Sequence, residues 1–277
     1  MIGASDRGKA WLVASGKGGV GKSTVVSALA QALARQGMRT CVVDGDIGLR
    51  DQDALLGLEN RIVYDLVDVS NKECRLTQAL ISPLEQSNLS LLPASQFARA
   101  KELDPKAFPR IIAELKKQFD HVIIDGPAGI ERGLRGILTA EYDETLIVCT
   151  PDDVCIRNAE RAVFTMESKK LPRPAVIVNR LVPDLIEAGE MYAAQVVAQT
   201  LDLPLMGEIP EDQTVYRALI THVPLMDTDC EAQRALARIA QRMKGENAPL
   251  PDYGRQKRAW YHKLFRRRIK EVKRIDR

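Results

Sequence analysis

Nine residues near the N-terminus, S-G-K-G-G-V-G-K-S at 15–23, have the types and spacing that suit phosphate binding. They fit the pattern G-x-x-x-x-G-K-[ST], in which backbone N–H groups surround a phosphate. In this pattern Lys22 reaches the β- and γ-phosphates of a nucleotide, and the Ser23 hydroxyl holds Mg²⁺. The residues expected to line the nucleotide phosphates are Gly16, Lys17, Gly18, Gly19, Val20, Gly21, Lys22, Ser23 and Thr24.

A second lysine, Lys17, directly follows the first glycine of this loop. From that position its long stem can extend away from its own loop. A mobile positive charge placed there could neutralise transition-state charge in a second molecule, as an arginine finger does. The alternative is a solvated surface lysine.

Phosphoryl chemistry also needs carboxylates near the metal ion. Asp125 ends the apolar run H-V-I-I-D, which suits a Walker-B aspartate. Asp44 and Asp46 lie two residues apart, so on an extended segment they point to the same side, and Asp46 is then available to position an attacking water or a water of the metal. Asp51 and Asp53 could instead cap the next helix. The predicted metal-site residues are Ser23, Asp46 and Asp125, and the predicted catalytic residues are Lys17, Lys22, Asp46 and Asp125.

The elements around the loop predict an α/β fold. An apolar run at 10–15, a helical pattern at 22–36 and a second apolar run at 40–44 make a strand–helix–strand unit around the glycines. Further strands are predicted at 89–93, 121–125, 145–150 and 175–179, and further helices at about 105–118, 155–169, 190–200 and 229–243. This alternation indicates a P-loop NTPase fold, a mostly parallel sheet covered by helices on both faces. Ligands in such sheets bind at the carboxyl ends of the strands, where the loops are 16–23, 44–53, 125–131, 150–157 and 179–184.

Composition excludes several classes of protein. No run of 18 apolar residues is present, so no membrane-spanning helix is expected. The polar N-terminus lacks an apolar signal core, so secretion is not expected. The five cysteines form no C-x-x-C pair, and we expect them to be reduced, with no metal or disulfide role.

The charge is distributed unevenly along the chain. Residues 255–277 contain eleven Lys or Arg and two acids, a net charge of +9, whereas the other 254 residues carry −6. The stretch 245–254, G-E-N-A-P-L-P-D-Y-G, is typical of a linker. We therefore expect an ATPase-type domain at 1–244, a linker at 245–254 and a basic tail at 255–277 whose partner is an anionic surface.

The tail is amphipathic if it is wound as a helix. Its apolar side chains fall within about 180° and most of its cations fall on the opposite half. Arg268 falls within the apolar arc, so it either snorkels outward or lies beyond a shorter helix. A basic helix with a Trp, Phe and Leu face is typical of an interfacial membrane binder. The residues expected at the membrane are Trp260, Leu264, Phe265, Ile269, Val272, Lys263, Arg266 and Arg267.

Two alternatives for the tail stay open, namely a helix packed on its own domain and a nucleic-acid-binding arm. The aromatic and aliphatic face argues against nucleic acid, because phosphate contacts need the cations but not that face.

The sequence resembles the ParA/MinD family of deviant Walker-A ATPases, and its septum-site members in particular. The stretches that carry the resemblance are S-G-K-G-G-V-G-K-S (15–23), D-x-D-I-G-L-R (44–50), V-Y-D-L-V-D-V (63–69), L-P-A-S-Q (92–96), D-x-P-A-G-I-E (125–131) and I-P-E-D-Q (209–213). They are spread over about the first 215 residues and are jointly very specific. The basic amphipathic end also resembles that of the septum-site members.

The resemblance implies a role for each motif. Lys17 would be the signature lysine that reaches the phosphates of the partner's site in an ATP-dependent homodimer. Asp46 would orient the hydrolytic water, Asp125 would be the metal-linked Walker-B acid, and G-P-A-G-I would sense the γ-phosphate. On the adenine side the implied residues are Asn179 and Arg180, with Pro210 to Asp212 closing on the base. The absence of an N-K-x-D motif is consistent with ATP rather than GTP.

Three departures from the family pattern lie near the expected dimer and partner surfaces. Asp51 replaces the usual asparagine after G-L-R, Gly126 replaces the frequent serine before P-A-G-I, and R-N-A-E-R at 157–161 replaces R-D-x-D-R. They leave nucleotide binding secure but put the hydrolysis rate and the partner response in doubt.

The resemblance implies a cell-division regulator with ATP and Mg²⁺ as cofactors. Its ATP-bound dimer would bind the cytoplasmic face of the inner membrane, recruit MinC to block FtsZ assembly away from midcell, and leave when a partner such as MinE stimulates hydrolysis. The alternatives are an ATPase that regulates flagellar number, disfavoured by the short segment before the first strand, and a ParA-type DNA-partition ATPase.

Overall fold

The computed structural model describes residues 7–83, 87–99, 102–128, 137–251 and 253 of the chain. The predicted tail lies outside these residues, and so do Gly129 and Ile130 of the predicted γ-phosphate sensor G-P-A-G-I. None of the helices in the described residues combines the length and the hydropathy that a membrane span needs.

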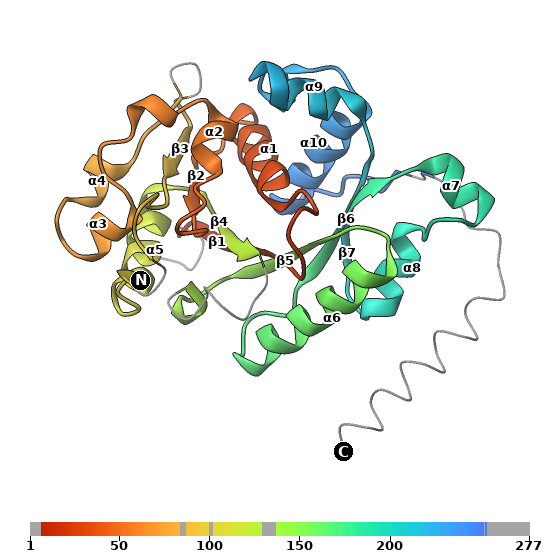
Figure 1. The fold of residues 1–277 in the computed structure, drawn as a ribbon, viewed down its shortest axis with the longest axis horizontal. Helices are drawn as coiled ribbons and strands as arrows, with labels where there is room; N and C mark the ends of the chain where they lie inside the picture. Colours follow the sequence, from red (N-terminus) through yellow and green to blue (C-terminus); the bar gives the residue numbers. More distant parts are fainter. Residues whose placement is uncertain (1–6, 84–86, 100–101, 129–136, 252, 254–277) are drawn as a thin grey trace.

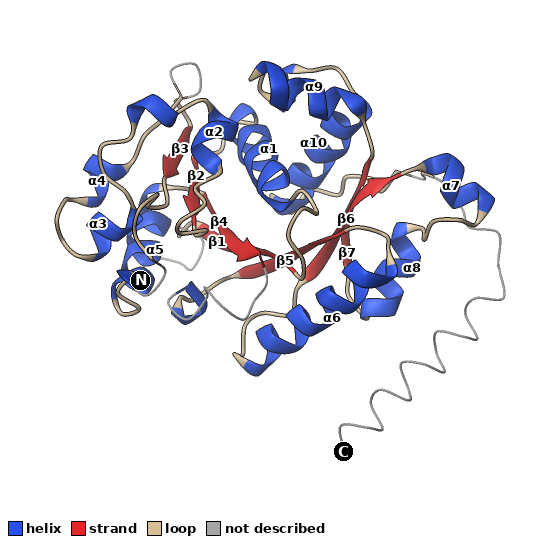
Figure 2. Ribbon diagram, in the orientation of Figure 1, coloured by secondary structure: helices blue, strands red, loops and turns tan. Residues whose placement is uncertain are grey.

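Seven strands form one parallel sheet with the order β3-β2-β4-β1-β5-β6-β7 (Figure 2). The predicted parallel sheet is therefore confirmed, and a seventh strand extends it at one edge. The strands are β1 (Lys9–Ser15), β2 (Thr40–Asp44), β3 (Leu89–Leu92), β4 (His121–Ala128), β5 (Glu144–Cys149), β6 (Ala175–Leu181) and β7 (Leu205–Pro210).

Helices cover both faces of the sheet. Figure 1 shows α1 beside α10 on one face and α5, α6 and α8 on the other. The helices are α1 (Lys22–Arg35), α2 (Gln52–Leu56), α3 (Leu66–Ser70), α4 (Leu76–Ala79), α5 (Ala107–Gln118), α6 (Asp153–Ser168), α7 (Pro183–Ala188), α8 (Ala194–Leu201), α9 (Gln213–Thr221) and α10 (Glu231–Met243). Short 3-10 turns lie at η1 (Glu59–Arg61), η3 (Ile137–Thr139) and η4 (Leu225–Asp227).

The strands are buried on both faces, which explains their continuous apolar runs. The core between sheet and helices contains large, fully buried side chains such as Leu12, Leu29, Leu33 and Phe108. This packing fixes the carboxyl ends of β1, β2 and β4 next to one another, and the candidate site lies at that edge.

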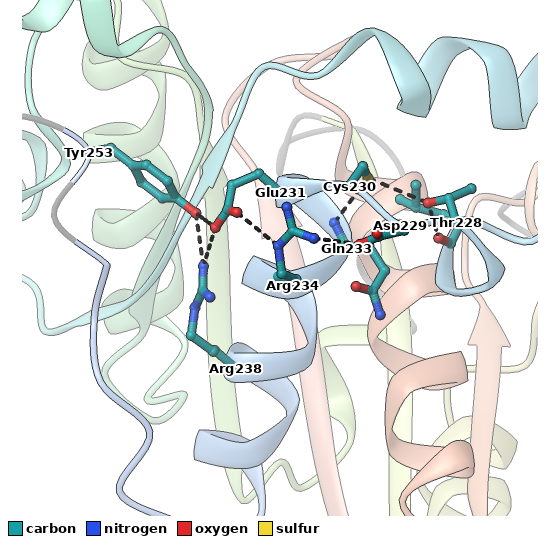
Figure 3. A network of polar contacts seen from close by, with 9 residues as sticks. Thr228, Asp229, Cys230, Glu231, Gln233, Arg234, Arg238 and Tyr253 are labelled. Carbon is teal, nitrogen blue, oxygen red and sulfur yellow. Dashed lines mark hydrogen bonds and ion pairs between the residues drawn. The ribbon is translucent and has the colours of Figure 1, made fainter.

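Hydrogen bonds attach residues 245–251 and 253, called the strap from here on, to α10. The Arg242 guanidinium donates hydrogen bonds to the carbonyls of Ala248 (2.9 Å), Pro249 (2.6 Å) and Met206 (2.7 Å). Figure 3 shows Tyr253 pointing toward Glu231 and Arg238 of α10. The stretch that its composition marks as a linker is thus held by specific contacts where the structure describes it.

Candidate functional site

The glycine loop between β1 and α1 leaves the N-terminus of α1 open to an anion. Gly19 and Gly21 have φ angles of 81° and 88°, in the left-handed region that glycine adopts without strain. No side chain caps α1, and its first turn contains no acidic residue. The first N–H groups of a helix have no partner within the helix, and the helix dipole adds positive potential there. The loop therefore fits a phosphate group.

Two close approaches hold the loop in place. A Cβ added to Gly16 would lie 2.2 Å from the carbonyl carbon of Asn158 in α6, so only glycine fits there. On the other side, the Asn179 amide donates a hydrogen bond to the Val20 carbonyl at 2.8 Å. The loop is thus packed between α6 and the end of β6.

Lys22 and Asp125 form a buried ion pair at the centre of the site. The Lys22 side chain is 5% exposed, and its ammonium contacts Asp125 Oδ1. The same ammonium lies 3.3 Å from the Ser23 hydroxyl. The structure therefore brings together three of the residues that the sequence singles out, and a carboxylate and a hydroxyl are oxygen donors of the kind that Mg²⁺ prefers.

Asp44 is a central residue of the site that sequence reasoning did not select. It pairs with Asp125 in the register of β2 and β4, and it is completely buried. Burial, and next the neighbouring Asp125 carboxylate, raise the pKa of Asp44 to about 7, although hydrogen bonds from the backbone N–H groups of Asp46 and Gln52 act in the opposite direction. The D-x-D spacing was the available signal, because the first aspartate of that pair ends the strand.

The loop after β2 places the other acidic residues. Asp46 is half-buried in a turn, where its carbonyl accepts from the N–H groups of Leu49 and Arg50. Asp51 occupies the N-cap position of α2, but its side chain makes no capping hydrogen bond, so the capping alternative is wrong for it. Asp53 is buried and forms an ion pair with Arg50 at 2.8 Å.

Lys17 lies exposed on the glycine loop. Its charge acts on Asp152, the N-cap of α6. Burial favours a higher pKa for Asp152, but hydrogen bonds from Thr150 and Cys155 and the Lys17 charge outweigh it, so this pKa is lowered. The Lys17 ammonium is therefore available at the surface next to the β5–α6 loop.

The residues expected around adenine line one cleft. Gly21, Thr24, Asn179, Arg180, Pro210 and Asp212 all contribute to it. Arg180 has a φ of 62°, and its side chain lies 3.8 Å from the Glu211 carboxylate. Asp212 caps α9 through a hydrogen bond from the Thr214 N–H at 2.9 Å. The cleft adjoins the glycine loop, so one ligand could occupy both.

Known proteins resemble this chain in sequence and in fold. A family model described as "ParA: NUBPL iron-transfer P-loop NTPase" matches residues 8–244. The septum site-determining protein MinD of Helicobacter pylori is 42% identical over 260 residues, which cover 91% of this chain and 96% of the relative. MinD of Bacillus subtilis is 39% identical over 246 residues, 88% of this chain and 91% of the relative. This chain belongs to the MinD family of P-loop NTPases.

Solved MinD structures have the same architecture. The MinC:MinD cell division protein complex of Aquifex aeolicus matches with a TM-score of 0.81 and 34% identity, covering 89% of this chain and 100% of that one. MinD of Pyrococcus horikoshii, solved as a complex with Mg-ADP, matches with a TM-score of 0.75 and 25% identity, covering 85% and 95%. The glycine loop of this MinD-family chain is thus a P-loop, the element that holds nucleotide phosphates and Mg²⁺ in this class of NTPase.

Proposed function

We propose that this chain is an ATP-hydrolysing cell-division regulator that selects the septum site. The observation that carries the proposal is the uncapped N-terminus of α1 beside the buried Lys22–Asp125 pair, in a chain 42% identical to a MinD protein. A phosphate loop next to metal-type carboxylates is the arrangement that phosphoryl transfer requires.

Each residue has a role in this proposal. The N–H groups of the glycine loop and the Lys22 ammonium bind the β- and γ-phosphates, and Asn179, Arg180, Pro210 and Asp212 surround the adenine. Ser23 and Asp125 would hold Mg²⁺, which would neutralise charge on the phosphates. Asp46 orients the attacking water.

Lys17 acts in the partner subunit. It is exposed beside the phosphate loop, so it can reach across an interface between two ATP-bound copies. Its charge there stabilises the negative charge that develops during hydrolysis. ATP then joins the two copies, and its hydrolysis separates them.

The dimer connects the nucleotide to the membrane and to partners. Each copy contributes one basic tail, 255–277, and two linked tails raise avidity by about 10²–10⁴ over a single one. The ATP-bound dimer therefore occupies the cytoplasmic face of the inner membrane and hydrolysis releases it. A MinC-type inhibitor binds the membrane-bound dimer, a role supported by the similarity to the MinC:MinD complex of Aquifex aeolicus, and a MinE-type partner stimulates hydrolysis.

Co-sedimentation with anionic liposomes tests this function. Full-length protein should sediment with ATP and not with ADP, and a variant truncated after Gly254 should stay in solution with both. Release of phosphate from ATP should accompany the cycle. Binding that ignores the nucleotide or survives the truncation would contradict the membrane switch, and ATP-dependent binding to DNA would favour a partition ATPase instead.

A further inference from the structure

Gln52, the first residue of α2, is a glutamine buried completely among the acidic residues of the site. Its side-chain Nε2 donates two hydrogen bonds, one to Asp125 Oδ2 at 2.7 Å and one to the Ser23 carbonyl at 3.0 Å. Its backbone N–H donates a third, to Asp44 Oδ2 at 3.1 Å. One residue therefore joins the ends of β2 and β4 to the first turn of α1.

These contacts fix the orientation of Asp125. The Lys22 ammonium contacts Oδ1 and the Gln52 amide contacts Oδ2, so rotation of the carboxylate would break one contact or both. A hydrogen bond to an ionised carboxylate is stronger than one between neutral groups. Without Gln52, the buried Oδ2 would have no donor among the described residues, which is unfavourable.

The remaining polar atom of Gln52 has no donor among the described residues, as is also true of Gln31, but Gln52 differs because its amide contacts Asp125 of the proposed cation site. Its Oε1 is buried and has no hydrogen-bond partner in the described part of the chain. Buried acceptors are nearly always satisfied, by protein or by water. A water molecule of a hydrated cation, held beside Ser23 and Asp125, would supply the missing donor.

We propose that Gln52 is a positioning residue that orients Asp125 and completes the surroundings of Mg²⁺ in this site. The orienting part rests on the contacts alone, whereas the Mg²⁺ part rests on the proposed function. Mutation of a residue that hydrogen-bonds to a metal ligand typically lowers metal affinity or activity by about 10- to 100-fold. The β2–α2 loop is thereby coupled to the cation, because any movement of α2 displaces Gln52.

The test compares Gln52→Met with Gln31→Met. Methionine has a similar length but donates no hydrogen bond. Gln31 is a matched control because it is also a buried glutamine with an unpartnered Oε1, and it lies in α1 eight residues beyond Ser23, about 12 Å along the helix. Its amide donates to Ser27 instead of to a carboxylate. Gln52→Leu serves as a second apolar variant if Gln52→Met does not fold.

Two readouts separate this proposal from the proposed function. The first is urea unfolding without nucleotide: Gln52→Met should lower the midpoint in the natural background but much less in an Asp125→Ala background. Equal losses in both backgrounds would overturn the positioning role. The second is ADP affinity measured by calorimetry with Mg²⁺ and with EDTA.

Gln52→Met should weaken the Mg²⁺-dependent part of ADP affinity by about tenfold and leave affinity in EDTA within about twofold, whereas Gln31→Met should change neither. An unaltered Mg²⁺ dependence in Gln52→Met would overturn the metal part of the proposal. Failure of the natural chain to bind ADP would instead contradict the proposed function, and the nucleotide-free unfolding experiment would still decide whether Gln52 positions Asp125.

Discussion

At the scale of single residues, the Lys22–Asp125 pair makes the free protein depend on both charges. Removing one partner of a buried ion pair typically costs about 3–5 kcal/mol, because the other charge stays buried alone. Lys22→Met should therefore be strongly destabilised, and the double variant Lys22→Met/Asp125→Asn should regain part of the loss while binding no nucleotide. Urea unfolding measures the stabilities of the single and the double variant. Equal stabilities would contradict an energetic coupling between Lys22 and Asp125.

Substitution of Lys17, unlike that of Lys22, should hardly change the stability of the protein, because Lys17 is exposed. Lys17→Ala should change the free energy of unfolding by less than about 0.5 kcal/mol, as is usual for surface positions. ADP binding to the monomer should persist, while ATP-dependent dimerisation and stimulated hydrolysis should be lost. Light scattering with ATP and with ADP measures the dimer. A Lys17→Ala variant that still dimerises and hydrolyses normally would show that this lysine does not act in the partner's site.

At the scale of elements, the sequence predicted six of the seven strands because their buried runs are continuous and apolar. It missed β7, where Gly207 and Glu208 interrupt the apolar run. The structure gives a reason for the glycine: a Cβ at Gly207 would lie 2.3 Å from the Ile239 side chain of α10. The residue that weakens the strand pattern is the one that allows a helix to pack against that strand.

Local sequence patterns also predicted only part of the candidate functional site. The glycine loop stands out because it follows a recognisable strand, and Asp125 and Asn179 stand out because each ends a recognisable apolar run. Gln52 does not, because its role depends on which strands are neighbours: β2 lies beside β4 in the sheet although β3 and several helices come between them in the chain. Contacts across that register join Gln52 and Asp44 to Asp125, and no local pattern encodes them.

The β1–β4 pair also contains a pH-sensitive contact between Trp11 and His121. The Trp11 indole donates to His121 Nδ1 at 3.1 Å, and burial lowers the pKa of His121 to about 4. An unfolded histidine titrates near pH 6.5, so the unfolded chain binds more protons between about pH 6.5 and 4. The contribution of His121 is thus fully present above about pH 6.5 and is lost as the pH falls toward 4, by at most about 3 kcal/mol.

This pH dependence can be measured as a difference between two proteins. In His121→Phe a phenyl ring, which cannot be protonated, replaces the imidazole. The stability of this variant should therefore fall less than that of the natural chain between pH 7 and pH 4.5. Urea unfolding at both values gives the difference, in which the titration of the other groups cancels. Parallel losses of stability in the two proteins would show that the pKa of His121 does not differ between the folded and unfolded states.

At the scale of the whole molecule, the strap connects the C-terminal end of α10 to Tyr253, the last residue that the structure describes. Its last described residue, Tyr253, donates to Glu231, and Glu231 lies next to Ala232, a residue that lines the predicted adenine cleft. Asp212 lines the same cleft as Ala232. The last described residue of the chain is therefore connected to the predicted adenine cleft through α10.

Arg242 is the residue to change, because it donates to two strap carbonyls and to Met206. Arg242→Met should leave these three acceptors without their donor and release the strap, so that amide hydrogens in 245–251 exchange faster with deuterium while those of β1 and β4 do not. Arg173→Met is the matched control, since Arg173 is an exposed arginine that donates hydrogen bonds to a carbonyl and a carboxylate, both of Asp202.

If the strap orients the tail for the membrane, Arg242→Met should also weaken ATP-dependent liposome binding although all residues of the tail are present. Faster exchange with unaltered liposome binding would limit the strap to a structural role, and unaltered exchange would show that the contacts of Arg242 do not hold it.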